Sequence, residues 1–187
     1  MTRRRALILL AISTVAIGVV LAVLDGRMRD SGGPGIVGFE FAGSEKRAAE
    51  ILGEWGDEGQ DAARASLWID YAYILAYGAF LTLAAIATRE LALQRGWRWM
   101  AGGGLAAIPM AAAGASFDAI EDVGLLLALD GHGGDLAPLL ATVCATLKFA
   151  LLALVIAYLL AGLLLRLRDR RGTPSPSKGF ERDSAGS

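Results

Sequence analysis

The chain has 187 residues, of which 55% are hydrophobic and 20% are charged, and its mean hydropathy is +0.49. Its net charge of −1 at pH 7 argues against nucleic acid as an electrostatic partner, because domains that bind nucleic acid are usually basic. Cys144 is the single cysteine, which excludes an intrachain disulfide and any redox or zinc motif built on paired cysteines.

Four stretches of the chain are long and apolar enough to cross a membrane. A helix needs about 20 mostly apolar residues to cross a hydrocarbon core of ~30 Å. The stretches that reach this length are residues 6–24, 67–88, 99–129 and 136–165. We therefore predict an all-α fold, a four-helix transmembrane bundle that forms a single membrane domain over residues 1–171. The polar tail, residues 172–187, is expected to be disordered and cytoplasmic.

The basic residues predict how the bundle is oriented. With the N-terminus inside, the cytoplasmic segments hold twelve of the 18 lysines and arginines, so both ends are expected in the cytoplasm. The composition, rich in alanine, glycine, leucine and arginine, is typical of a high-GC bacterial genome, so we expect the spans to lie in a bacterial inner membrane. A cleaved signal peptide is the alternative for residues 6–24. We favour a retained span, because the stretch exceeds the usual apolar core of about 7–15 residues and no small-residue cleavage site precedes Asp25.

Residues 25–66 are expected to form a polar segment outside the membrane. Ser44 has the chemistry of an N-cap, and a short amphipathic helix follows it. The apolar residues of this helix recur at helical spacing and are Ala48, Ile51, Leu52 and Trp55. A turn over residues 56–59 should end it, and a second helix should begin near Gln60. The amphipathic helix either anchors the chain at the membrane surface, which we favour, or forms a lid over a site within the membrane.

Five ionisable residues lie within the predicted spans, where charges are costly and usually face the interior of the bundle. They are Asp70 in the second span, Asp118, Glu121 and Asp122 in the third, and Lys148 in the fourth. The three acids of the third span are spaced i, i+3 and i+4, so they share one helical face. The turn over residues 130–135 is centred midway between Asp118 and Lys148. Two antiparallel helices therefore place these two residues at the same depth.

Together these residues predict a polar pocket in the outer half of the bundle, with Lys148 at its floor. Arg64 could cap the pocket, and Tyr71, Tyr73 and Tyr77 could add hydroxyl groups. Ionisable residues within a membrane commonly mark a functional site. The pocket is thus expected to bind a cation or a small polar ligand, or to relay protons. The residue pattern specifies no metal and leaves any cofactor unknown.

Three short motifs resemble an uncharacterised family of bacterial four-span membrane proteins. They are residues 51–59 (ILGEWGDEG) followed by Arg64, Asp70 and Tyr71, then residues 117–122 (FDAIED), and finally residues 146–148 (TLK). The family typically shows Asp-x-x-Glu-Asn in the third span, and Asp122 here replaces the asparagine with an acid. The resemblance covers residues 44–149. It implies a shared polar site within the membrane and no particular activity.

Three classes of function remain open on the sequence. The first is a membrane protein that binds an ion or small ligand, for which a homo-oligomer is expected because four spans are few for a carrier. The second is an enzyme that acts on a lipid-type substrate through a carboxylate. The third is a structural or accessory subunit whose buried charges only fix helix packing or meet a membrane partner. In each class the protein is embedded in the lipid bilayer, and nucleic acid is not expected as a partner.

Overall fold

The computed structural model describes residues 2–172, and nearly all of them are helical. The five helices are α1 (Arg3–Asp30), α2 (Ile36–Glu40), α3 (Glu45–Gln94), α4 (Arg98–Leu129) and α5 (Leu136–Gly172). No β-strand occurs among these residues, so the predicted all-α fold is confirmed. The part of the predicted disordered tail beyond residue 172 lies outside the described residues.

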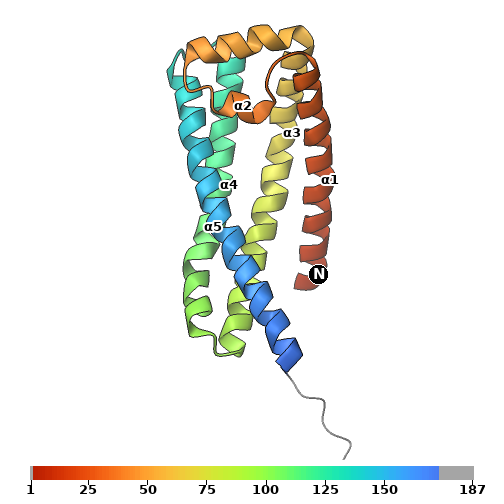
Figure 1. Ribbon diagram of the computed structural model, residues 1–187, viewed down its shortest axis with the longest axis vertical. Helices are drawn as coiled ribbons and strands as arrows, with labels where there is room; N and C mark the ends of the chain where they lie inside the picture. The colour runs from red at the N-terminus through yellow and green to blue at the C-terminus, as the bar shows by residue number, and fades with distance from the viewer. Residues whose placement is uncertain (1, 173–187) are drawn as a thin grey trace, which may run out of the picture.

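Four long helical segments run side by side, and one end of the bundle is covered (Figure 1). α1 packs along α3, while α3, α4 and α5 pack against one another. Short connections at residues 95–97 and 130–135 make α3, α4 and α5 antiparallel neighbours. The first part of α3 lies across one end of the bundle, and α2 is tucked beneath it (Figure 1).

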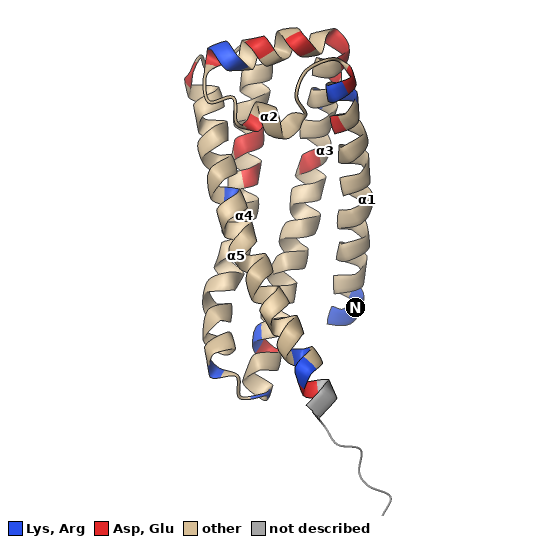
Figure 2. Cartoon of the chain, viewed as in Figure 1, with Lys and Arg blue, Asp and Glu red and all other residues tan. Residues whose placement is uncertain are grey.

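By length and composition, α1, α3 and α5 could each cross a membrane. This finding supports the prediction of a membrane protein. α4 has 32 residues and covers the range of the predicted span 99–129, but it carries three buried acidic residues. Apart from a cluster within the bundle, the charged side chains gather toward the two ends of the helices (Figure 2).

α3 changes direction at Gly56, whose φ of 56° and ψ of −165° are not helical. A positive φ of this kind is readily adopted only by glycine. The predicted turn over residues 56–59 is therefore too long, because the chain breaks at one residue and is helical again before Gln60. The predicted N-cap is confirmed, since Ser44 Oγ accepts a hydrogen bond from the Arg47 N–H at 3.3 Å.

The cap helix, residues 45–55 of α3, packs its apolar face onto the end of the bundle. Ile51 and Trp55 are buried there in a core built with residues of α1, α2 and α4, among them Met28, Phe39 and Leu125. Trp55 Nε1 donates to the Pro34 carbonyl at 2.6 Å, and the Glu45 N–H donates to Asp135 in the α4–α5 turn at 2.8 Å. The cap helix thus covers one end of the bundle, and its Trp55 is buried there. Both the lid and the surface-anchor interpretations of this helix stay predictions.

A short helix, α2, lies in the segment 25–66, at a place where the sequence predicted no helix. Asp25 of α1 holds its start, because Asp25 Oδ1 accepts a hydrogen bond from the Ile36 N–H at 2.7 Å. Thr142 of α5 holds its end by donating its hydroxyl to the Glu40 carbonyl at 2.8 Å. α2 is therefore fixed between α1 and α5, and the Glu40 side chain is buried there.

Trp55→Ala is expected to lower the free energy of unfolding by about 3–5 kcal/mol, because a large buried side chain and its hydrogen bond are lost. Chemical unfolding in detergent, followed by circular dichroism, measures the change. Trp68→Ala is the matched control, since Trp68 is 64% exposed, and a change within about 0.5 kcal/mol is expected there. Equal losses in the two variants would contradict a packed cap.

Candidate functional site

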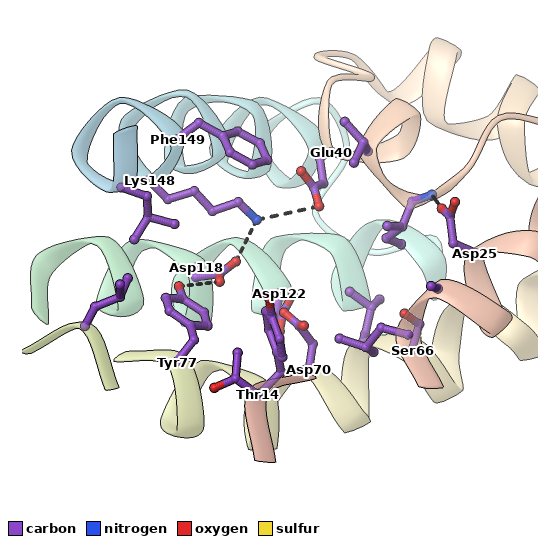
Figure 3. Close-up of a pocket in the computed structure, with 18 of the residues that line it drawn as sticks. Thr14, Asp25, Glu40, Ser66, Asp70, Tyr77, Asp118, Asp122, Lys148 and Phe149 are labelled. Atoms are coloured by element: carbon purple, nitrogen blue, oxygen red, sulfur yellow. Dashed lines mark hydrogen bonds and ion pairs between the residues drawn. The ribbon is translucent and has the colours of Figure 1, made fainter. Parts of the chain in front are cut away.

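Lys148 is the centre of a buried cluster of charges. It leaves α5 toward α4, and only 6% of the residue is exposed. Its Nζ lies 2.6 Å from Asp118 Oδ1 and 2.9 Å from Glu121 Oε1, both on α4. Glu40 Oε1 of α2 lies 3.6 Å from the same Nζ (Figure 3). One ammonium group therefore binds carboxylates from two other helices.

The α4–α5 hairpin brings Lys148 and Asp118 to the same depth, as the position of its turn predicts. Asp118 and Glu121 are about one helical turn apart, so both can face the same partner. The two helices approach closely at Gly124, where a Cβ atom would lie 3.0 Å from the Ala137 carbonyl oxygen. The absence of a side chain at Gly124 thus helps to hold the hairpin closely packed on the turn side of the cluster.

Asp118 links the ammonium group to α3. Tyr77 donates its hydroxyl to Asp118 Oδ2 at 2.6 Å, while Asp118 Oδ1 binds Lys148. Hydrogen bonds to an ionised group are stronger than those between neutral groups. Because Asp118 has partners on both sides, α3, α4 and α5 are joined by one continuous chain of polar contacts.

Two further carboxyl groups, those of Asp70 on α3 and Asp122 on α4, lie beside Asp118. One oxygen from each of the three lies within 4.8 Å of the others. Asp122 is only 2% exposed, and its Oδ2 has no hydrogen-bond partner among the described residues. Three oxygens at this spacing could surround one cation, since hard metal ions bind oxygen at about 2–2.6 Å.

The cluster holds more acidic groups than basic ones. Its acids, gathered around the single ammonium group, are Glu40, Asp70, Asp118, Glu121 and Asp122. Within the described part of the chain, Glu40 Oε2 and Glu121 Oε2 lack a partner, as Asp122 Oδ2 does. Burial raises the pKa of Glu40, against the opposing effect of the Lys148 ammonium. An unpartnered buried carboxylate is costly, and a proton or a bound cation would lower that cost.

A cavity of about 520 Å³ adjoins the cluster. Glu40, Asp70, Asp118, Asp122 and Lys148 lie together in its wall, and Asp25 and Ser66 line it beyond them (Figure 3). Its other walls are mostly apolar and include Leu21 of α1, Phe80 and Leu81 of α3, and Leu152 and Ile156 of α5. A concave space with apolar walls and a few convergent polar groups is typical of a small-molecule site.

Three of the predicted site residues do not line this cavity, contrary to the prediction. Glu121 belongs to the cluster through its contact with Lys148 but lies behind the cavity wall. Arg64 pairs with Asp130 at 2.7 Å, so it links α3 to the α4–α5 turn instead of capping the acids. Tyr71 packs against Trp68, with ring centroids 5.9 Å apart. Tyr71 follows Asp70 directly, and consecutive helical residues point about 100° apart, so the two side chains face different surroundings.

Glu40 belongs to the cluster although nothing in the sequence led us to include it. It lies in residues 25–66, the polar segment expected outside the membrane. A signal was present, because Glu40 is the single charge in an apolar run, between Phe39 and Phe41. Its burial depends on α2 folding back beneath the cap helix, and no local pattern indicates that path.

The fold thus brings together five of the predicted site residues, namely Asp70, Asp118, Glu121, Asp122 and Lys148. No protein-family model matches the chain, and no curated protein or solved structure matches it either. What the cluster offers chemically is a set of carboxylate oxygens beside one fixed ammonium group. Such groups bind cations or exchange protons.

Lys148→Met is expected to lower the free energy of unfolding by about 3–5 kcal/mol, because it leaves buried carboxylates without their cation. Unfolding of the purified protein in detergent measures the loss. Lys46→Met removes an exposed lysine and serves as the control, with an expected change within about 0.5 kcal/mol. Wild-type stability of Lys148→Met would show that the buried ion pairs contribute little to holding the helices together.

Proposed function

We propose that this protein is a four-span integral membrane protein of a bacterial inner membrane, with both ends in the cytoplasm, whose buried acidic cluster binds a cation. α4 is the fourth span in this proposal. It lies antiparallel to α3 and α5, both of which are apolar enough to cross a membrane. Its acids Asp118, Glu121 and Asp122 are each at most 4% exposed, so they would not face lipid.

The distribution of basic residues supports the proposed orientation. The N-terminus and the α3–α4 turn lie at the end of the molecule away from the cap helix, and this end carries many of the basic side chains (Figure 2). Two ion pairs join helices there, Arg3 with Glu90 and Arg95 with Asp169. Lysine and arginine near the ends of membrane helices favour the cytoplasmic side. The resemblance to a family of four-span bacterial proteins agrees with this topology.

Cation binding rests on one observation, the excess of buried carboxylate oxygens over their partners. Lys148 satisfies one oxygen of Asp118 and one of Glu121. Asp122 Oδ2 remains without a partner beside the oxygens of Asp70 and Asp118. A cation bound here would offset negative charge that a medium of low dielectric constant cannot screen. In its absence the same carboxyl groups can hold protons, so cation binding and proton release would be linked.

A structural role is the second candidate, and the contacts of Lys148 favour it. The ammonium group has two carboxylates within 3 Å and a third at 3.6 Å, so it is well satisfied without any ligand. Such a network can fix the register of helices against one another. In that case the remaining acids would simply be protonated, and no added cation would change the stability of the protein.

The proposed topology predicts which positions are labelled from outside. In a variant with Cys144→Ala, single substitutions Asp57→Cys and His132→Cys should react with a membrane-impermeant maleimide on intact cells. Gln94→Cys should react only after the cells are permeabilised, because α4 separates residue 94 from residue 132. All three residues are exposed in the structure. Labelling of Gln94→Cys and His132→Cys from the same side would contradict a membrane-spanning α4.

Cation binding predicts a rise in thermal stability of the detergent-solubilised protein when sodium, magnesium, calcium or methylammonium ions are added. Binding to the folded state alone stabilises it by about 2.7 kcal/mol when the ligand is at 100 times its dissociation constant. Asp122→Asn should remove the response. The control is Asp57→Asn, which neutralises an exposed acid near the cap helix and should keep it.

The outcomes of this titration separate the two candidates. A stabilisation that disappears in Asp122→Asn and persists in Asp57→Asn supports a bound cation at the cluster. A wild-type protein whose melting temperature responds to none of these ions would leave the structural role as the better account.

A further inference from the structure

The cavity is too large and too apolar to serve only a bare metal ion. An ion held by Asp70, Asp118 and Asp122 would occupy a small part of a space of about 520 Å³. Much of the remaining wall is apolar, and on α5 it continues from Lys148 to Ile156. The eight residue steps between these two positions cover about 12 Å along the bundle. The geometry thus joins a charged region to an apolar compartment long enough for a hydrocarbon chain.

The cavity opens through the side of the bundle. Three of its apolar lining residues are strongly exposed, Val37 of α2 (48%), Phe149 of α5 (42%) and Ile156 of α5 (48%). α1 contributes Leu21 and other lining residues, yet it packs along α3 and not along α5. The opening therefore lies between α1 and α5, next to α2, which bridges these two helices at Asp25 and Thr142, and its edges are apolar.

The end of the bundle nearest the cluster is closed. The cap helix seals it with a buried core that includes Ile51, Trp55, Phe39 and Leu67. α2 lies beneath the cap helix and is fixed at Asp25 and Thr142. A ligand that enters without unfolding this core must come through the side opening, which would face lipid in a membrane-spanning bundle.

We propose that the cation bound by the cluster is an amphiphile, a protonated primary amine on a hydrocarbon chain, which enters sideways from the bilayer. This inference rests on the proposed function and names its ligand class. The ammonium head lies among Asp70, Asp118 and Asp122, and the chain lies along Phe80, Leu81, Leu152 and Ile156.

The chemistry of the site favours an alkylamine over a zwitterionic lipid and over a neutral alcohol. A phosphate beside the amine, as in a zwitterionic lipid headgroup, would lie close to the acidic residues that line the cavity, among them Glu40, Asp70 and Asp122, and be repelled. A neutral alcohol would leave Asp122 Oδ2 without a cation. Aromatic rings at Tyr73, Tyr77 and Phe149 border the cavity and can attract an ammonium group over their faces.

The test is a series of n-alkylamines, from methylamine to decylamine, titrated into the full-length protein in detergent by isothermal calorimetry. Affinity, referred to the free aqueous amine, should rise about two- to fourfold for each added methylene until the apolar compartment is filled. n-Alkanols of equal length control for partition into the micelle and should bind at least tenfold more weakly.

Two matched variants isolate the apolar compartment. Leu152→Trp fills it and should weaken octylamine binding at least tenfold while leaving methylamine unchanged. Leu154→Trp places the same side chain on the outer face of α5, where Leu154 is 56% exposed, and should bind like the wild type. Ile156→Trp narrows the side opening, where space is available, and is the second variant if Leu152→Trp does not fold.

The outcomes distinguish this inference from the proposed function. Binding of methylamine or magnesium with an affinity that does not change with chain length would keep the cation site and overturn the amphiphile. Displacement of octylamine by phosphatidylethanolamine in nanodiscs would overturn it in favour of a lipid headgroup. A wild-type protein that binds none of these cations would overturn both proposals together.

Discussion

The position of one ammonium group organises this molecule. Lys148 of α5 binds Asp118 and Glu121 of α4 and lies 3.6 Å from Glu40 of α2, while Asp118 also accepts the hydroxyl of Tyr77 from α3. Four elements that are distant in the sequence thus share one polar network. Because a buried charge without a partner is far more costly than one with several, any displacement of these helices is penalised at Lys148.

Burying the charges of this network costs desolvation free energy, which offsets much of the stability that their attraction adds to helix packing. Apolar residues of similar volume often replace a buried ion pair without loss of stability, and some replacements are stabilising. This protein has more acids than its lysine can pair, and it leaves oxygens of Glu40, Glu121 and Asp122 without partners among the described residues. This excess of acids motivates our proposal that the cluster binds a cation or exchanges protons.

The architecture around the cluster directs access to it. The cap helix and α2 close one end of the bundle with a packed core, and the acids of α4 face inward, so the polar groups are separated from water at that end. α1 stays attached to α3 and leaves a side of the cavity open toward α5. α3 changes direction at Gly56. Its first part lies across the end of the bundle, and its second part runs along the bundle beside α1 and α4 (Figure 1).

The sequence by itself determined the four long helical segments, the acidic face of α4 and the common depth of Asp118 and Lys148. These follow from helix geometry, in which rise and rotation per residue are fixed and a turn sets the register of its hairpin. Only the tertiary structure decided that Glu40 enters the cluster, that Tyr77 reaches Asp118 while Tyr71 packs on Trp68, and that Arg64 pairs with Asp130. These contacts depend on the path of α2 and on the rotation of α3 about its own axis. Both are set by packing between segments distant in the sequence, which local spacing does not encode.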